Sequence, residues 1–174
     1  TRAGGSGPRI FVFAEVPSNS PRSSLIVCPE AEIGRVAGEF IVQSLRTKAA
    51  EEGKSEAAGR IVELTVAPPD APHAGYSEGF LKATSSQPGI TLVHQAPSKM
   101  LAEDTADRMN EVLRLQKDFE VIFAHNDLIA AAASKAVAGA RPELKERILV
   151  LGVDGNLGKG GGKEMIIKGD LDAT

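Results

Sequence analysis

Short, nearly continuous apolar runs alternate along the chain with longer stretches whose apolar residues recur every three or four positions. The runs are typical of buried β-strands and the longer stretches of helices packed on one face. Strands are predicted at residues 10–14, 24–28, 60–66, 90–95, 121–124 and 147–153, and helices from Pro29 and over 73–85, 100–117, 127–139 and 163–168. The alternation predicts an α/β fold, a parallel sheet with helices on both faces.

The helix that begins at Pro29 carries an apolar stripe, which predicts the face that packs on the rest of the domain. Its members are Ile33, Val36, Ala37, Phe40, Ile41 and Leu45. The charged stretch that follows, residues 46–59, is expected to be a solvent-exposed helix end and a loop.

Composition narrows the functional classes. The 174 residues suit one domain or a lobed part of one, with 42% hydrophobic and 25% charged residues. The net charge of −3 argues against nucleic-acid binding by this segment, which would favour a basic excess. The single cysteine excludes an internal disulfide, and no apolar run is long enough to cross a membrane. Residues 1–8 lack the apolar core of a signal peptide.

Gly75–Gly79 matches the G-x-S-x-G pattern of hydrolases, with Ser77 as the nucleophile. That pattern needs a strand running directly into the serine, whereas a proline-rich breaker at 67–72 intervenes here. We therefore favour a helix start, and no catalytic residue is predicted. An enzyme that uses Ser77 stays an alternative, which labelling by a fluorophosphonate probe would test.

Two other patterns fail on spacing. The glycine-rich stretch Gly158–Lys163 resembles a phosphate-binding loop in composition only, because Glu164 follows where the motif needs Ser or Thr. His73, His94 and His125 share no metal-ligand spacing. Neither a metal site nor a cofactor is predicted.

The junction after the strand 121–124 is the most informative stretch. This strand ends at His125 and is followed by Asn126 and Asp127, where an alanine-rich helix begins. Both residue types commonly cap helices, but side chains at the carboxyl edge of a parallel sheet also contact ligands. We expect Asn126 to contact a ligand and Asp127 to cap the helix.

Three strand ends of this kind are predicted to lie along one edge of the sheet. They carry Lys99, Asn126 and Asp154, which we expect to converge on one cleft. An amide offers donors and an acceptor, and a carboxylate accepts two hydroxyl hydrogen bonds. Such groups suit a neutral polyhydroxylated ligand, and they lack a nucleophile with an adjacent base. Binding is therefore favoured over catalysis.

At these residues the chain resembles the type I periplasmic solute-binding proteins, the ribose/galactose-binding-like group. The same fold forms the effector-binding core of lactose-repressor-type regulators. The resemblance extends over nearly the whole chain from Ile10 and rests on Glu32–Gly38, Gly75–Phe80, Phe123–Asp127, Leu151–Gly155 and Ile167–Thr174.

The resemblance implies that Asn126 and Asp154 hydrogen-bond a sugar. Glu15 stands where the family has an aspartate, and it keeps an acceptor, although the family's next residue, an arginine, is absent. Tyr76 occupies a position where the family often has arginine, and Lys99 lies near the place of an aromatic stacking residue. The candidate ligand-binding set is therefore Asn126, Asp154, Tyr76, Glu15 and Lys99.

The function that the resemblance implies is binding of a small polar solute, a sugar or sugar-like molecule, in a cleft between two lobes. The protein would serve an ABC importer or a sensory system, with a permease or membrane sensor as partner. Its location would be the periplasm or, as a lipoprotein, the cell exterior. The alternative is the effector-binding core of a lactose-repressor-type regulator.

The resemblance also implies a partial domain. Residues 1–29 correspond to a remnant of the N-terminal lobe with its crossover, and 30–174 to the C-terminal lobe. Half a cleft leaves a ligand exposed, so we expect weak or absent binding by this chain alone. A micromolar affinity in a calorimetric titration would contradict that expectation.

Overall fold

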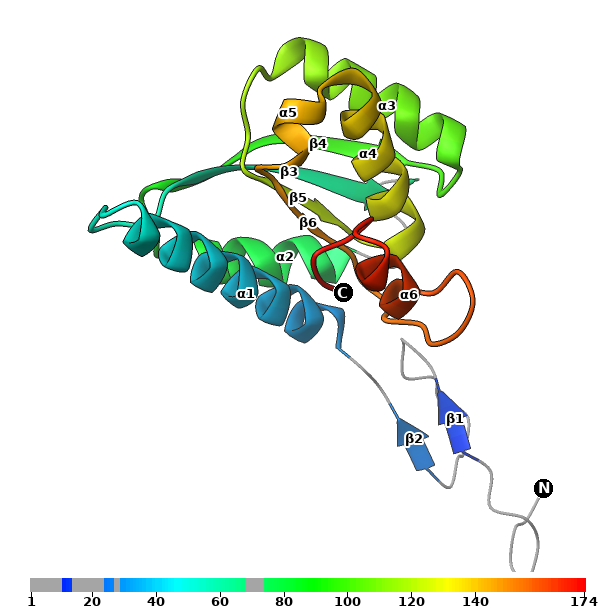
Figure 1. The fold of residues 1–174 in the computed structure, drawn as a ribbon. Helices are drawn as coiled ribbons and strands as arrows, with labels where there is room; N and C mark the ends of the chain where they lie inside the picture. The colour runs from blue at the N-terminus through cyan, green and yellow to red at the C-terminus, as the bar shows by residue number, and fades with distance from the viewer. Residues whose placement is uncertain (1–10, 14–23, 27–28, 68–73) are drawn as a thin grey trace, which may run out of the picture.

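The computed structural model describes residues 11–13, 24–26, 29–67 and 74–174. Its centre is a parallel four-stranded sheet in the order β4-β3-β5-β6 (Figure 1). The strands are β3 (Gly59–Val66), β4 (Ile90–Ser98), β5 (Val121–Ala124) and β6 (Leu149–Leu151). The helices are α1 (Glu30–Glu51), α2 (Ala74–Thr84), α3 (Ala102–Leu115), α4 (Asp127–Ala140), α5 (Pro142–Lys145) and α6 (Gly162–Ile167). The predicted α/β class and parallel sheet are confirmed.

Helices cover both faces of this sheet, with α1 and α2 on one side and α3 and α4 on the other (Figure 1). Side chains alternate between the two faces along a strand. In β3, Val62 and Leu64 belong to the core shared with α3 and α4, whereas Ile61 joins the core under α1 and α2. This alternation explains why the strands are apolar throughout, because each has two faces to bury.

Helix α1 packs by most of its predicted apolar stripe, with Ile33 and Ala37 partly buried against the core, but two members of the stripe are exposed. Ile41 and Leu45 are buried as expected, but Val36 is 52% and Phe40 42% exposed. The helix instead approaches α2 through small residues: a Cβ at Gly34 would lie 2.0 Å from the carbonyl oxygen of Tyr76. The close crossing of two backbones at a glycine rotates the apolar stripe partly out of the core.

Two further differences concern element bounds. Strand β4 continues to Ser98, three residues beyond the predicted strand, and the short helix α5 was not predicted. After α6 the chain returns beside β6, where Ala173 forms a parallel bridge with Leu151. In the described residues, no helix has the length and apolar character needed to cross a membrane.

The N-terminal strands β1 (Phe11–Phe13) and β2 (Ser24–Ile26) pair in parallel with each other and form a separate two-stranded sheet. Both lie within the predicted strands at 10–14 and 24–28. Glu15, one of the predicted ligand-binding residues, lies outside the residues that the structure describes.

Candidate functional site

Asn126 both caps α4 and reaches across to the neighbouring strand end. It follows β5 with an extended backbone, and its Oδ1 accepts a hydrogen bond from the backbone N–H of Leu128 at 2.8 Å. Its amide Nδ2 donates to Oδ2 of Asp154 at 2.5 Å. The capping bond fixes the orientation of the amide, so that its N–H groups point along the carboxyl edge of the sheet.

Asp154 follows β6 in a conformation that L-residues rarely adopt, with a φ of 124°. Its side chain is exposed at the carboxyl edge of the sheet. Backbone strain of this kind costs on the order of 1–3 kcal/mol and is concentrated at functional sites. The hydrogen bond between Asn126 and Asp154 shows that these two side chains converge, as the sequence predicted.

Asp127 does not cap α4, contrary to the prediction, because Asn126 performs that role. Its carboxylate is 3% exposed and accepts hydrogen bonds from the Thr174 hydroxyl and, at 3.0 Å, from the backbone N–H of Gly155. Burial raises the pKa of Asp127 above its usual range, and these two hydrogen bonds only partly oppose the shift. Asp127 thereby anchors the loop that carries Asp154.

Lys99 lies apart from the Asn126–Asp154 pair. It follows β4 at the edge of the sheet, and β3 separates that strand from β5. The backbone N–H of Lys99 donates at 2.9 Å to the carboxylate of Asp104, in the first turn of α3, and the Lys99 side chain is exposed. Strand order is not encoded in local sequence patterns, so the position of Lys99, two strands away from Asn126, could not be predicted.

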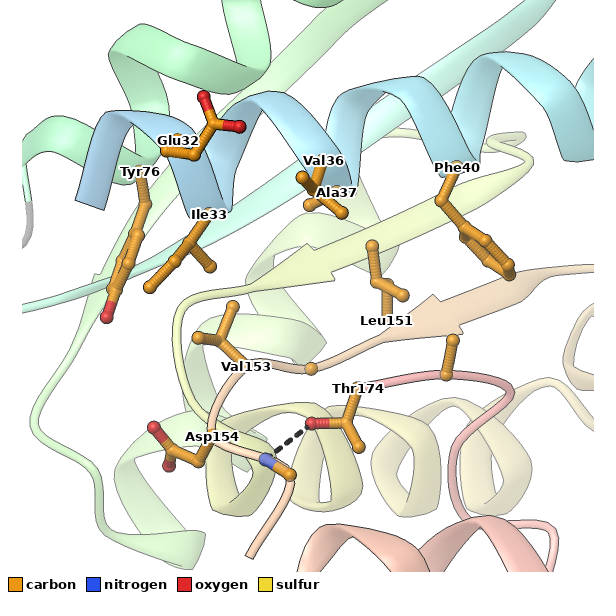
Figure 2. Close-up of a pocket in the computed structure, with 13 residues that line it drawn as sticks. Glu32, Ile33, Val36, Ala37, Phe40, Tyr76, Leu151, Val153, Asp154 and Thr174 are labelled. Carbon is orange, nitrogen blue, oxygen red and sulfur yellow. Dashed lines mark hydrogen bonds between the residues drawn. The ribbon is translucent and has the colours of Figure 1, made fainter. Parts of the chain in front are cut away.

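A groove of about 570 Å³ runs between α1 and the end of β6, and we call it the α1 groove (Figure 2). Tyr76 and Asp154 line it together with Glu32, Ile33, Val36, Ala37, Phe40, Leu151, Gly152, Val153, Gly155, Ala173 and Thr174. Its lining is mainly apolar, whereas each desolvated sugar hydroxyl needs a hydrogen-bonding partner. The polar edge formed by Asn126 and Asp154 is therefore a better candidate ligand site than the groove.

Sequence reasoning missed a polar cluster around a buried carboxylate behind this edge, which we call the Glu63 cluster: Glu63, Ser77, Gln95 and His125. The Glu63 carboxylate is fully buried and receives the Ser77 hydroxyl at 2.7 Å, the Gln95 amide at 2.6 Å and His125 Nε2 at 2.9 Å. Burial acts to raise the pKa of Glu63, but these three hydrogen bonds outweigh it and lower the pKa below its usual value.

A signal for this cluster was present in the sequence. Glu63 is the only charged residue within the apolar run Ile61–Val66, and a charge in a buried strand needs partners. The partners follow from strand register, which pairs Glu63 with Gln95 on one side and Phe123 on the other. His125 lies two residues beyond Phe123 and shares its face of the sheet.

A family model described as periplasmic binding protein domain matches residues 8–174. The chain belongs to this family. The fold and the resemblance to type I solute-binding proteins that the sequence indicated are thus confirmed. No curated protein matches the chain at a significant level.

Solved structures with the same fold accompany this match. The fructose-binding periplasmic domain of a hybrid two-component system has a TM-score of 0.77 and 28% identity, over 94% of this chain and 51% of that one. A carbohydrate transporter solute-binding protein from Agrobacterium radiobacter, in complex with D-arabinose, has a TM-score of 0.71 and 20% identity over 94% and 52%. An ABC transporter periplasmic solute-binding protein from Actinobacillus succinogenes, with bound D-allose, has a TM-score of 0.69 and 21% identity. The match covers 84% of this chain and 46% of that one.

The periplasmic binding protein domain described here spans about half the length of those solved structures. Its family and these neighbours are solute-binding proteins, which agrees with the prediction of binding rather than catalysis.

The geometry around Ser77 differs from that of a serine hydrolase. In a catalytic triad the serine hydroxyl donates to a histidine, and the carboxylate orients that histidine from behind. In this periplasmic binding protein domain the Ser77 hydroxyl donates to the carboxylate of Glu63 instead, and His125 contacts the same carboxylate oxygen. Within the described ranges, no group of three or more His, Cys, Asp or Glu side chains is arranged to hold a metal ion.

Proposed function

We propose that this chain supplies one wall of a sugar-binding cleft, with Asn126 and Asp154 as the hydrogen-bonding pair. The observation that supports it is the contact between the two side chains at the carboxyl edge of β5 and β6, in a domain of the periplasmic binding protein family. Ligands of open parallel sheets bind at that edge. The amide supplies N–H donors and the carboxylate supplies acceptors, the combination that a hydroxyl-rich ligand requires.

Preorganisation supports the same proposal. The cap bond to Leu128 fixes Asn126, and the Asp127 carboxylate holds the backbone N–H of Gly155, next to Asp154. Polar groups that are already oriented before binding pay a smaller ordering cost when a ligand arrives. Tyr76 lines the groove beside this edge, and we propose that the small exposed part of its otherwise buried ring contacts the ligand.

The neighbours support a sugar as the class of ligand. The 28%-identical neighbour is described as fructose-binding, and others hold D-arabinose or D-allose. One belongs to a two-component system and two to transporters, so the partner of this chain would be a membrane sensor or a permease and its location the periplasm. These neighbours favour transport or sensing over the repressor-type alternative.

The domain organisation belongs to the same proposal. Residues 30–174 would form one lobe of the binding protein, and residues 1–29 a remnant of the other with its crossover. Support comes from the separate β1-β2 sheet and from the half-length match to the solved neighbours. Closure of two lobes over the sugar would then favour the bound form.

The test is a sugar titration followed by amide NMR spectra, with D-fructose, D-arabinose and D-allose as probes. We expect one of them to shift the side-chain amide signal of Asn126 with a dissociation constant in the millimolar range, since one wall makes only part of the contacts. Asn126→Ala and Asp154→Ala should abolish the sugar-dependent shifts of the neighbouring backbone amides, which both variants retain. Thr105→Val, on the opposite face of the sheet, should retain it.

Two outcomes would count against the proposal. Sugar-dependent shifts that survive both Asn126→Ala and Asp154→Ala would place the ligand elsewhere. A micromolar affinity for the 174-residue chain would contradict the half-cleft organisation.

A further inference from the structure

The Glu63 cluster joins three separate elements at one carboxylate. Ser77 belongs to α2, Gln95 to β4, and His125 follows β5, while Glu63 itself lies in β3. All three donors come from side chains, and each closes a contact between segments that are at least 14 residues apart in sequence. Such a node fixes the relative positions of the elements around it.

Two of these donors are chain neighbours of proposed ligand-binding residues. Ser77 directly follows Tyr76, and His125 directly precedes Asn126. The rings of Tyr76 and His125 also meet edge to face, with centroids 5.2 Å apart. A displacement of the Glu63 carboxylate would therefore move both proposed ligand-binding residues.

His125 carries an unsatisfied polar atom. Because an ionised carboxylate only accepts hydrogen bonds, His125 donates through Nε2 to Glu63. Its other ring nitrogen, Nδ1, is buried and has no hydrogen-bond partner among the described residues. Leaving such an atom unpaired destabilises a fold, so the histidine is poorly explained by stability alone. A role in placing the adjacent Asn126 explains it better.

We propose that Glu63 is a positioning residue for the ligand edge, and that its bonds to Ser77 and His125 set where Tyr76 and Asn126 stand. This proposal depends on the proposed sugar-binding function only for the identity of the ligand at the edge. The placement of the two residues is a property of the ligand-free chain and is measured without sugar.

The chain offers a selective probe, because it contains one tyrosine and no tryptophan. Tyrosine fluorescence reports on Tyr76 alone, and Tyr76 gives the one set of tyrosine ring signals in NMR spectra. In Glu63→Leu, which removes every acceptor, we expect the Tyr76 ring signals and the Asn126 side-chain amide signal to shift. Glu63→Gln keeps the shape and an acceptor for Ser77 and His125, so it should retain wild-type signals.

Thr105→Val is the matched control. Thr105 is fully buried and shares a 2.7 Å hydrogen bond with Ser98, also fully buried, on the other face of the sheet. The substitution breaks a buried side-chain bond that also involves a β4 residue, yet it should leave the Tyr76 and Asn126 signals in place. Equal shifts in Thr105→Val and Glu63→Leu would reduce Glu63 to a general stabiliser and overturn the proposal.

A second pair of variants applies if Glu63→Leu does not fold. Ser77→Ala removes the bond next to Tyr76, and Gln95→Ala removes the bond to β4, which carries neither proposed ligand-binding residue. We expect Ser77→Ala to shift the Tyr76 signals more than Gln95→Ala does. The reverse order, or unchanged Tyr76 signals in Ser77→Ala, would overturn the proposal.

A D-fructose titration separates this proposal from the proposed function. With sugar binding present in the wild type, Glu63→Leu should weaken it about tenfold while Thr105→Val leaves it unchanged. If no sugar binds the wild type but the ligand-free signals shift as expected, the proposed function fails and the positioning role stands. If sugar binds equally to wild type and Glu63→Leu, the positioning role fails and the proposed function stands.

Discussion

Two buried carboxylates flank the proposed ligand edge, and they differ in how they are satisfied. Glu63 is completely buried and receives three side-chain hydrogen bonds, one of them from a histidine. Asp127 is 3% exposed and receives one hydroxyl and one backbone N–H. The pKa of Glu63 is lowered, whereas that of Asp127 is raised.

The difference shows that burial alone does not decide the charge of a carboxyl group. Burial acts to raise the pKa of both groups, and the number and kind of donors determine which effect is larger. Glu63 therefore holds a stable negative charge under α2, while Asp127 holds its charge less firmly under the loop of Asp154. The ligand edge therefore lies between a carboxylate held by three side-chain donors, Glu63, and one held by two donors, Asp127.

The largest expected effect comes from removing the better satisfied group. Glu63→Leu should lower the free energy of unfolding by about 3 kcal/mol, because it leaves buried His125 without its partner. Asp127→Ala should cost only about 1–2 kcal/mol, since its donors lie nearer to solvent. Urea unfolding followed by far-UV circular dichroism measures both values. A larger loss in Asp127→Ala would reverse the comparison.

A smaller change in the free energy of unfolding, a gain rather than a loss, is expected at the loop that Asp127 anchors. Asp154 has a φ of 124°, which glycine adopts without strain. Asp154→Gly should therefore raise the free energy of unfolding by roughly 0.5–1 kcal/mol while abolishing the sugar response. The same unfolding experiment, with Asp154→Ala as the control that keeps the strain, measures the gain. A loss of stability in Asp154→Gly would show that the side chain supports the loop.

The smallest effect is a pH dependence with opposite signs at the two carboxylates. Since the pKa of Glu63 is lowered on folding, its stabilisation is present above the ordinary glutamate pKa of about 4.3 and is lost as the pH falls. The stability advantage of wild type over Glu63→Gln should therefore shrink on acidification.

Asp127 should behave in the reverse way. Because its pKa is raised on folding, its favourable contribution is complete below the ordinary aspartate pKa of about 3.9 and is lost as the pH rises through the folded value. The stability of wild type relative to Asp127→Asn should therefore increase on acidification. Unfolding curves of the wild type and both variants from neutral to acidic pH test the pair, and equal signs would contradict the account.

Much of the fold was predictable from the sequence because apolar runs and helical periodicity are local. The α/β class, the strand positions and the meeting of Asn126 with Asp154 all follow from such patterns and from the rule for parallel sheet edges. The exposure of Val36 and Phe40 on α1 was not predictable, since it depends on how closely the helix approaches α2 at Gly34.

The partners of Glu63 and the position of Lys99 were equally inaccessible to sequence reasoning. Both depend on strand order and register, including the irregularity between Ile61 and Val62 that aligns Glu63 with Gln95. Asn126 shows a related difficulty, because capping and ligand contact looked like alternatives in the sequence. The amide oxygen of Asn126 caps the helix, while its amide nitrogen, which donates to Asp154, faces the proposed ligand edge.

A crystal structure of the chain soaked with D-fructose at high concentration tests the central claim most directly. We predict sugar hydroxyls within hydrogen-bonding distance of the Asn126 amide and the Asp154 carboxylate, at the carboxyl edge of β5 and β6. A sugar bound in the α1 groove or elsewhere, with no contact to either side chain, would contradict the account.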